Sequence, residues 1–326
     1  MRKFLGRAIL GLAILSSISA ACRAQEWPSK PVKLIIPFAV GGHSDQVARG
    51  ISGALQEEWK QPVIVDAKPG GGTAIATGTV AKSAPDGYTL YLANSCGLTQ
   101  AVSLNPSLGY DPIKDFTPIS TVDVGYTILV RRPGLNVNSV AELIALAKSK
   151  PGSLTYASSG TDGPVHIGTE EFIRRAGINV LHVPYTGTSP AIVALLGDQV
   201  DFMFLDTSGV PHVTSGKVKA LGVASPKAWA SLPGVVPLGD QGFQGFTLGC
   251  TDIVVAPAGT SRAIVDKVQQ TLAKVMQRPQ IVSYFATIDS PIGVSTPEDA
   301  RDLIATEYQK NGKIIRDLGL VQGTAK

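Results

Sequence analysis

Residues 32–55 read VKLIIPFAVGGHSDQVARGISGAL, and this stretch decides the fold that the sequence predicts. The run Lys33–Pro37 is apolar and branched, which is typical of a buried strand. Gly41 and Gly42 interrupt the chain, Asp45 stands where a helix N-cap is expected, and apolar side chains then recur with helical spacing. The unpaired N–H groups and the positive dipole end of such a helix favour an anion. The pattern predicts either an anion-binding turn or an ordinary strand–helix connection.

Length and composition are those of a folded protein with more than one core. A chain of 326 residues is long enough for two domains. Hydrophobic residues make up 44% of the chain and charged residues 17%, which excludes a disordered or fibrous protein.

The first 24 residues are predicted to be a secretory signal peptide. Three basic residues precede the apolar run Ala8–Ile18, and small residues follow it. The apolar run is too short to span a membrane. We expect export with cleavage after Ala24; cleavage before Cys22, with lipidation of that cysteine, is the alternative.

The charge of the mature chain excludes nucleic acid as a partner. Four of the 29 Lys and Arg residues precede the first acidic residue, Glu26, and lie inside the predicted leader. Their removal leaves 25 basic and 25 acidic residues, a formal net charge of zero. No basic stripe of the kind that binds a phosphate backbone is present.

Two cysteines remain in the mature chain, Cys96 and Cys250. An exported protein could pair them, and two free, buried thiols are also compatible with the sequence, because their spacing does not decide. Neither belongs to a CxxC motif or a Cys/His cluster. His43, His182 and His212 show no ligand spacing either. We therefore predict no metal and no cofactor.

Short apolar runs alternate with helical stretches in two series. The first series runs from Lys33 to Asn94 and the second from Ser139 to Asp206. Helices at Asp266–Arg278 and Pro297–Leu318 end the chain. This alternation predicts an α/β fold with helices packed on parallel sheets.

The domain organisation is predicted from the return of the chain to its first unit near residue 250. Residues 25–124 and 250–326 are expected to form domain 1, and residues 125–249 domain 2. No low-complexity linker separates them, which suits two crossings of a hinge. A cleft between two such units closes on a ligand by hinge motion.

Three strand–turn–helix connections share a chemistry suited to a carboxylate. They span residues 37–42, 158–161 and 185–189, and they offer hydroxyl groups and glycines but almost no Lys or Arg. In parallel sheets such connections gather at the carboxyl ends of the strands, where ligands bind. We expect neutral donors, helix N-termini and bridging water to hold the ligand. Routine helix capping is the alternative for each turn taken singly, and capping is the expected role of Asp45.

The sequence gives no positive sign of catalysis. Gly70–Thr73 lacks the Gly-Lys-Ser/Thr sequence of a P-loop, and no Gly-x-Ser-x-Gly elbow is present. His166 and Glu170 lie one helical turn apart, but no third metal ligand is in view. We predict that the protein is not an enzyme and that His166 is hydrogen-bonded near the cleft. A secreted hydrolase that uses His166 or a cysteine is a remaining alternative.

Ordered motifs along the mature chain resemble those of one protein family, the Bug receptors, which are the extracytoplasmic solute-binding proteins of tripartite tricarboxylate transporters. The matching segments are Pro31–Phe38, Gly41–Asp45, Lys68–Gly72, Ala84–Leu90, Asp111–Pro118, Ala141–Ile144, Tyr156–Gly160, His182–Gly187 and Ala256–Thr260. Each segment is a weak signal, but their order and spacing together are specific. Two segments depart from the usual pattern: Lys68 stands where Arg is common, and Leu248–Cys250 lacks a frequent Trp.

The resemblance implies a type II periplasmic-binding-protein fold, with two βα domains, a hinge and a Venus-flytrap cleft. It also implies a small carboxylate ligand, membrane permease subunits as partners, a periplasmic location and a monomer. Val40, His43, Asp162 and Gly163 would set specificity. Carried over to this chain, the ligand-binding residues are Pro37, Phe38, Ala39, Gly41, Gly42, Asp45, Ser158, Ser159, Gly160, Thr161, His166, Tyr185 and Asp206. A protein that presents its carboxylate ligand to a membrane sensor would have the same site and is the alternative function.

Overall fold

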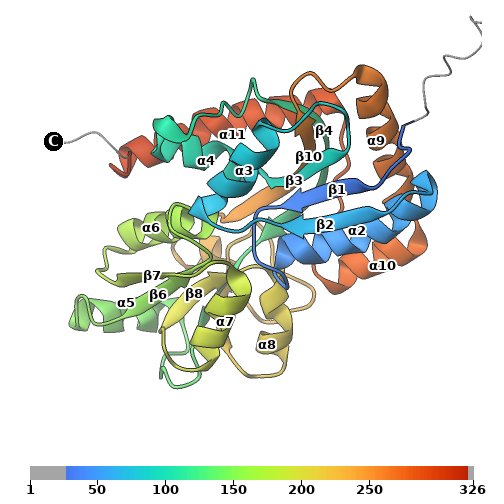
Figure 1. The fold of residues 1–326 in the computed structure, drawn as a ribbon. Helices are drawn as coiled ribbons and strands as arrows, with labels where there is room; N and C mark the ends of the chain where they lie inside the picture. The colour runs from blue at the N-terminus through green and yellow to red at the C-terminus, as the bar shows by residue number, and fades with distance from the viewer. Residues whose placement is uncertain (1–26, 322–326) are drawn as a thin grey trace, which may run out of the picture.

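The structure is a computed structural model that describes residues 27–321; the predicted signal peptide lies outside these residues. The strands are β1 (Val32–Ile36), β2 (Val63–Ala67), β3 (Thr89–Asn94), β4 (Phe116–Tyr126), β5 (Ile128–Arg131), β6 (Thr155–Ser158), β7 (Leu181–Pro184), β8 (Phe202–Leu205), β9 (Lys219–Val223) and β10 (Gly249–Pro257). The helices are α2 (His43–Trp59), α3 (Ala74–Ala81), α4 (Ser95–Leu104), α5 (Val140–Ser149), α6 (Pro164–Ala176), α7 (Thr188–Leu196), α8 (Val210–Thr214), α9 (Arg262–Val275), α10 (Pro279–Thr287) and α11 (Pro297–Asp317). Two sheets organise these elements (Figure 1), and we name the elements packed on each sheet lobe 1 and lobe 2.

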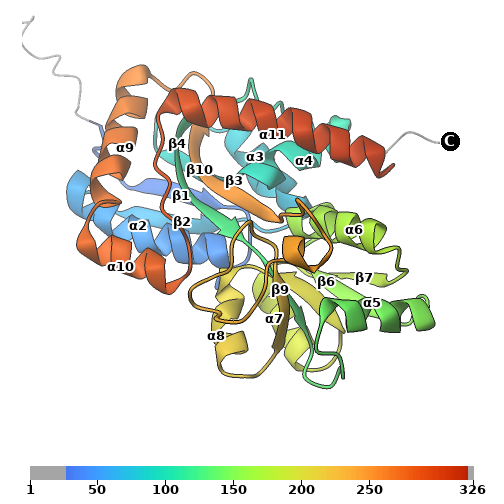
Figure 2. The ribbon, with the colours of Figure 1, turned by 180° about the vertical axis from the view of Figure 1, so that it is seen from behind.

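The sheet of lobe 1 has the strand order β2-β1-β3-β10-β4. β1 pairs in parallel with β2 and β3, whereas β10 is antiparallel to both β3 and β4. Apolar side chains of α2, α9 and α10 pack on one face and those of α3, α4 and α11 on the other. Figure 2 shows α11 lying along α4 on this second face.

The sheet of lobe 2 repeats this arrangement with the order β7-β6-β8-β5-β9. β6 pairs in parallel with β7 and β8, and β5 is antiparallel to β8 and β9. α5 and α6 cover one face, and α7 and α8 the other. In each sheet the antiparallel strand beside the parallel set, β10 or β5, is the one that arrives from the other lobe.

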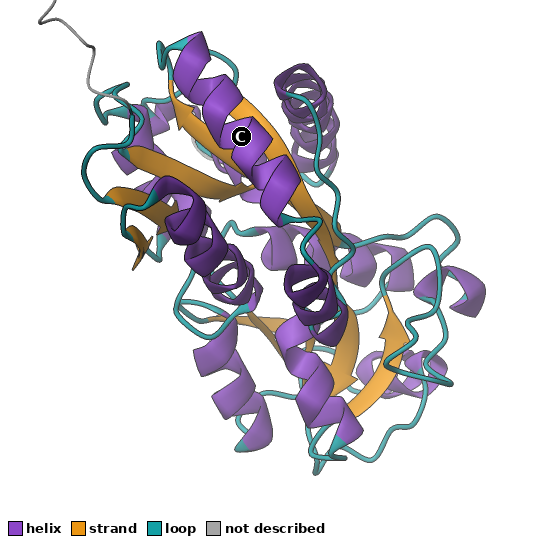
Figure 3. Ribbon diagram, turned by 90° about the vertical axis from the view of Figure 1, so that its right-hand side faces the viewer, coloured by secondary structure: helices purple, strands orange, loops and turns teal. Residues whose placement is uncertain are grey.

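The chain crosses between the lobes twice, and the two crossings lie next to each other (Figure 3). β4 and β5 are separated only by Thr127, so one extended segment runs from the first sheet into the second. The Thr127 N–H donates to the Leu248 carbonyl at 3.0 Å, and the Ala224 N–H donates to the Thr127 carbonyl at 2.8 Å. Leu248 directly precedes β10, which returns the chain to lobe 1. The two crossings are thus hydrogen-bonded to each other through Thr127 and Leu248.

The predicted fold class is confirmed, and the structure corrects several local predictions. α2 begins at His43 with Gly42 as its N-cap, so Asp45 is not the cap but lies in the first helical turn. Its carboxylate accepts from the N–H of Gly41, the residue before the cap, at 2.9 Å. The sequence pattern also favours a helix that begins at Pro190, whereas α7 begins two residues earlier, at Thr188.

Helices α4 and α10 were not predicted. The sequence of α4, SCGLTQAVSL, contains six residues with poor helix propensity, so its pattern is weak. Tertiary packing forms it: nine of its ten residues are buried. Among residues 27–321, no helix combines the length and the hydropathy needed to cross a bilayer.

Candidate functional site

A cavity lies between the two lobes, where the loops that follow their strands meet. It is small and partly open to solvent. Both lobes line it, through Phe38, Gly42, His43, Ser44, Asn94, Gly125, Thr127, Ser159, Pro164, Val165, Thr188, Asp206, Leu248, Gly249 and Cys250. In the described part of the chain, no Lys or Arg contributes to this lining.

The turn between β1 and α2 places a helix N-terminus at the cavity. Gly41 has φ +91°, a conformation that side-chain-bearing residues rarely adopt, and it lets the chain reverse before the helix. Gly42, His43 and Ser44, at the start of α2, line the cavity. The first N–H groups of a helix have no acceptor one turn earlier, so a helix N-terminus attracts an anion; in α2 the His43 N–H points to the Asp206 carboxylate.

Asp45 holds this turn rather than facing the cavity. Its buried carboxylate accepts from the Gly41 N–H at 2.9 Å and from Arg49 Nε at 2.9 Å. Both oxygens therefore have protein partners. The structure assigns Asp45 a positioning role for the glycine turn, which agrees with the capping chemistry expected from the sequence even though the cap itself is Gly42.

Lobe 2 brings two further helix N-termini to the same cavity. α6 begins at Pro164 after the cap residue Gly163, and α7 begins at Thr188 after the cap residue Gly187. Ser159, Pro164 and Thr188 line the cavity. Three helix dipoles thus present their positive ends to one space.

Four of the thirteen residues predicted from the resemblance line the cavity: Phe38, Gly42, Ser159 and Asp206. The other nine do not line it; they lie in the same turns or at the adjoining ends of β6, α2 and α6, and they are Pro37, Ala39, Gly41, Asp45, Ser158, Gly160, Thr161, His166 and Tyr185. Ser158 is fully buried, and its hydroxyl contacts His182 Nε2 at 2.6 Å. Tyr185 packs at the edge of the α7 core.

Asp206 connects the lobes at the floor of the cavity. It follows β8, and its Oδ2 accepts from Thr188 Oγ1 at 2.7 Å and from the His43 N–H at 3.5 Å. Its Oδ1 accepts from the Ser208 N–H at 3.0 Å and from the Ser208 hydroxyl. The carboxylate is therefore held by protein donors, including one from the N-terminus of α2.

His43 lies at the centre of a buried polar cluster that sequence reasoning missed. Its Nε2 is 2.7 Å from Asp123 Oδ2 and 3.7 Å from Asp252 Oδ2, and its Nδ1 is 2.7 Å from Thr207 Oγ1 in lobe 2. The side chains of Asp123 and Asp252 are fully buried. A signal was present: both aspartates interrupt apolar strands, at DVGY in β4 and TDIVV in β10, where an unpaired charge is costly.

The cluster changes the charge of its members. Burial alone would lower the pKa of His43, but the carboxylates around it, Asp123 foremost, raise that pKa to about 9. Burial also raises the pKa of Asp252, and repulsion from Asp123 adds to this rise. At neutral pH His43 is therefore an imidazolium beside Asp123.

His166 and His182 form a stacked pair behind the loops of lobe 2. Their ring centroids are 4.2 Å apart, and the Asp162 N–H donates to His166 Nδ1 at 3.1 Å. Glu170, the expected partner of His166, accepts from the Tyr156 hydroxyl at 2.5 Å and lies 4.0 Å from His166 Nε2. Burial lowers the pKa of both histidines, that of His182 to about 4 with a further contribution from His166.

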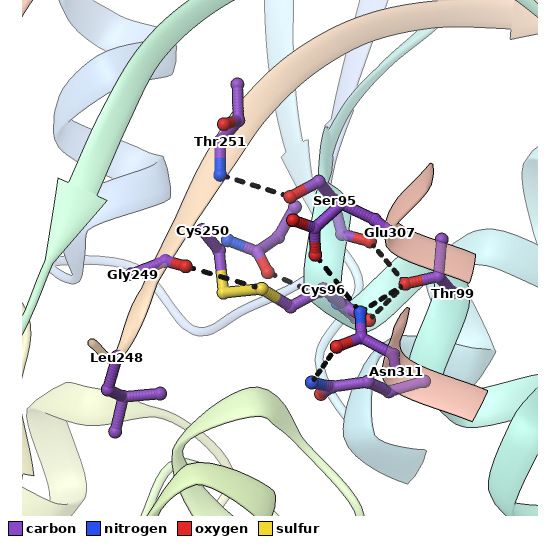
Figure 4. The surroundings of a disulfide bond; sticks show 12 residues. Ser95, Cys96, Thr99, Leu248, Gly249, Cys250, Thr251, Glu307 and Asn311 are labelled. Carbon is purple, nitrogen blue, oxygen red and sulfur yellow. Dashed lines mark hydrogen bonds between the residues drawn. A yellow bond between two sulfur atoms is a disulfide. The ribbon is translucent and has the colours of Figure 1, made fainter. Parts of the chain in front are cut away.

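Cys96 and Cys250, whose pairing the sequence left open, form a disulfide (Figure 4). Cys96, near the start of α4, is bonded to Cys250, near the start of β10, with Cα atoms 5.6 Å apart. Beside it the Thr251 N–H donates to Ser95 Oγ at 3.1 Å. Cys250 lines the cavity, so the bond fastens the returning crossing to α4 at the cavity wall.

The lobes approach each other closely at glycines. A Cβ at Gly72 would lie 2.7 Å from the Thr161 carbonyl oxygen, and one at Gly187 would lie 2.7 Å from the Ala39 Cβ. Ser189 Oγ of lobe 2 donates to the Val40 carbonyl of lobe 1 at 3.0 Å. These direct contacts describe a closed arrangement, which only glycine permits at the two points of approach.

A match to a family model identifies the family of this chain. Residues 47–320, most of the chain, match the model of the tripartite tricarboxylate transporter family receptor. The chain belongs to this family. It is 33% identical over 318 residues to protein BugT of Bordetella pertussis, an alignment that covers 96% of this chain and 97% of BugT. The resemblance to the Bug receptors found in the sequence is confirmed.

Three solved structures superpose along most of the chain. Periplasmic binding protein BugD matches with a TM-score of 0.87 at 30% identity, over 90% of this chain and 99% of BugD. MatC of Rhodopseudomonas palustris, solved with bound malate, matches with a TM-score of 0.82 at 28% identity, over 89% of this chain and 100% of MatC. R. palustris Rpa4515, solved with adipate, has a TM-score of 0.86 at 28% identity, over 90% of this chain and 99% of Rpa4515. The family is one of solute receptors, not of enzymes.

Proposed function

We propose that this receptor captures a small carboxylate in the cavity between its lobes and delivers it to a tripartite tricarboxylate-type membrane permease. The observation that carries the proposal is the convergence of three helix N-termini, those of α2, α6 and α7, on one cavity. Each presents the positive end of its helix dipole, which favours an anion. Malate and adipate in two related structures support a carboxylate of this size.

The binding chemistry follows from what the cavity contains. Ser159, Thr188 and Asn94 offer neutral donors, and the N-terminus of α2 offers main-chain N–H groups. With no Lys or Arg in the lining described, the carboxylate is recognised by hydrogen bonds and helix ends, with water where the gap exceeds hydrogen-bond length. Hydrogen-bond donors of this kind do not fix the distance between two carboxylate groups of a ligand. The apolar side chains of Phe38, Val165 and Leu248 would then contact the other end of the ligand.

Capture and delivery require opening and closing of the lobes. We propose that residues 25–124 with 250–326 move against residues 125–249, about the paired crossings at Thr127 and Leu248. The Val40–Ser189 hydrogen bond and the glycine contacts hold the closed state, in which a permease would recognise surfaces of both lobes. Export by the predicted leader would place this cycle in the periplasm, with the receptor acting as a monomer.

A thermal-shift screen tests ligand capture. The mature chain, Gln25 to Lys326, is heated with dicarboxylates including malate and adipate, with tricarboxylates, and with acidic and aromatic acids. A ligand that binds only the folded state raises the unfolding midpoint by mass action, with about 2.7 kcal/mol of stabilisation at 100 times its Kd. A folded protein that no carboxylate stabilises at millimolar concentration would contradict the proposal.

A pair of variants tests the first turn. Gly42 has ordinary clearance, with the nearest atoms 3.7 Å from an added Cβ, so Gly42→Val leaves the fold intact while its methyl groups enter the cavity. Gly53→Val, on the exposed face of the same helix with no neighbour within 4 Å, is the matched control. We expect Gly42→Val alone to abolish the thermal shift. Unchanged affinity in Gly42→Val would remove this turn from the site.

A further inference from the structure

The cluster around His43 gathers three metal-ligating groups from three distant segments. His43 opens α2, Asp123 lies in β4 and Asp252 lies in β10. One ligand atom from each, the imidazole nitrogen and two carboxylate oxygens, falls within 4.8 Å of the others. Because β4 and β10 are adjacent strands and Asp123 and Asp252 are register partners, the sheet itself fixes the two carboxylates side by side.

Two oxygens of this cluster lack a protein partner. Asp252 Oδ2 and Asp123 Oδ1 are buried and make no hydrogen bond, although both side chains are fully enclosed. Asp252 Oδ2 points toward His43 Nε2 at 3.7 Å, beyond hydrogen-bond length. An unpaired buried carboxylate oxygen costs more than any ordinary polar group, and a proton or a bound cation removes that cost.

Hydrogen bonds to neighbouring residues already hold the three side chains in place. Asn94 Nδ2 donates to Asp252 Oδ1 at 3.3 Å, the Ser290 hydroxyl donates to Asp123 Oδ2, and Thr207 Oγ1 contacts His43 Nδ1 at 2.7 Å. Hydrogen bonds of this kind orient the ligating side chains in metal sites. The Asn94 contact leaves Asp252 Oδ2 free to face His43, and the Thr207 contact directs His43 Nε2 toward the carboxylates.

We propose that His43, Asp123 and Asp252 bind one divalent ion of a first-row transition metal, such as Zn²⁺ or Co²⁺, which displaces the proton from His43 Nε2 into solvent when it binds. A mixed set of one imidazole and two carboxylates suits these ions, whereas Mg²⁺ and Ca²⁺ prefer oxygen ligands alone. Donor atoms bound to one such ion at about 2.1 Å lie about 3 to 3.5 Å apart. The distances of 2.7 and 3.7 Å from His43 Nε2 lie on either side of this range, so small side-chain movements suffice.

The proposed metal site needs no bound carboxylate, but it lies next to the cavity in which the carboxylate is proposed to bind. His43 and Asn94 line the cavity, while Asp123 and Asp252 lie behind it. His43 also contacts Thr207 and Asp206 of lobe 2, so an ion on its Nε2 fixes a side chain that both lobes share. Metal loading should therefore favour the closed arrangement and tighten ligand binding.

Direct metal titration of ligand-free protein tests the proposal. The mature chain is prepared without a polyhistidine tag, stripped with a chelator, and titrated with Co²⁺ while visible absorption is followed, and with Zn²⁺ by calorimetry. We expect one equivalent to bind, no binding of Mg²⁺ under the same conditions, and a metal-dependent rise in the unfolding midpoint. Asp252→Asn keeps the shape of the side chain and its Asn94 hydrogen bond, and should weaken Zn²⁺ at least about 100-fold.

Two further variants complete the design. Asp302→Asn makes the same change of charge on an exposed position of α11 and should bind Zn²⁺ like the unmodified chain. His43→Gln provides a second loss of a ligand if Asp252→Asn does not fold. No saturable binding to the unmodified chain, or equal binding in Asp252→Asn, would overturn the proposal and assign the cluster to a buried proton instead.

Discussion

Several residues in this receptor have structural roles that differ from those that their sequence positions suggest. Asp45, a predicted ligand contact or cap, accepts from the Gly41 N–H and so shapes the turn that carries the helix N-terminus. His43, expected to be a specificity residue in a variable loop, has its ring nitrogens committed to Asp123 and Thr207. Sequence spacing says which residues share a turn; it does not say which way their side chains point.

The stacked histidines predict a pH dependence of stability. The pKa of His182 is about 4 in the folded protein, against about 6.5 when unfolded, so the unfolded state binds more protons between these values. Neutral His182 makes its full contribution to the free energy of unfolding above pH 6.5, and this contribution is lost as the pH falls toward 4. Because the ring is partly exposed, we discount the full linkage value and expect a loss of about 1 kcal/mol between pH 7 and 5.

Urea unfolding at pH 7 and pH 5 measures this loss. His182→Gln retains a hydrogen-bonding side chain but does not titrate, so the difference between the two pH values should shrink by about the same amount in this variant. The same pH dependence in both proteins would show that His182 is not the titrating group.

Individual elements explain both the successful predictions and the failures. Strand β1 was predicted to within one residue because a branched apolar run bounded by turns is a clear signal. Helices α4 and α10 were missed because burial against β10 and α2 stabilises them, and their own sequences carry little helical signal. α4 matters for the site, since its first turn carries Cys96.

The disulfide between α4 and β10 should be a major source of stability. It joins residues 154 positions apart, and closing a loop of that size restricts the unfolded chain strongly. Replacing both Cys96 and Cys250 with Ala should lower the free energy of unfolding by about 2 to 5 kcal/mol. Denaturant unfolding with and without reductant provides the check: reductant should destabilise the unmodified chain and leave the double variant unchanged. An equal response of the two proteins would contradict this prediction.

At the scale of the whole molecule, function depends on how closely two lobes approach. Backbone meets backbone at Gly72, where an added Cβ would lie 2.7 Å from atoms of Thr161 and Asp162. The closed arrangement therefore tolerates no side chain at this position. Opening of the lobes removes the constraint, so a substitution here acts on closure more than on folding.

Gly72→Ala should weaken ligand affinity. Gly71 has the same φ of +59°, but a Cβ there meets only its own segment, at 3.4 Å from Ala74, so Gly71→Ala carries the backbone strain without the clash between lobes. Overpacking costs about 1–3 kcal/mol, which corresponds to about a 5- to 150-fold rise in Kd. We expect calorimetry to show this rise for Gly72→Ala relative to Gly71→Ala, with similar unfolding midpoints in the absence of ligand. Equal affinities would mean that the lobes do not close at this point.

Local patterns in the chain were enough to establish the fold class, the family and the three glycine-bearing turns, because periodicity, turn residues and ordered motifs are properties that the chain carries along its length. They placed Phe38, Gly42, Ser159 and Asp206 in loops that do line the cavity. The disulfide and the cluster of His43, Asp123 and Asp252 emerge only in the folded molecule, because their members lie 80 or more residues apart along the chain. Such contacts arise from the pairing of β4 with β10 and from the crossing of the chain between lobes, and no local pattern encodes which distant residues those pairings bring together.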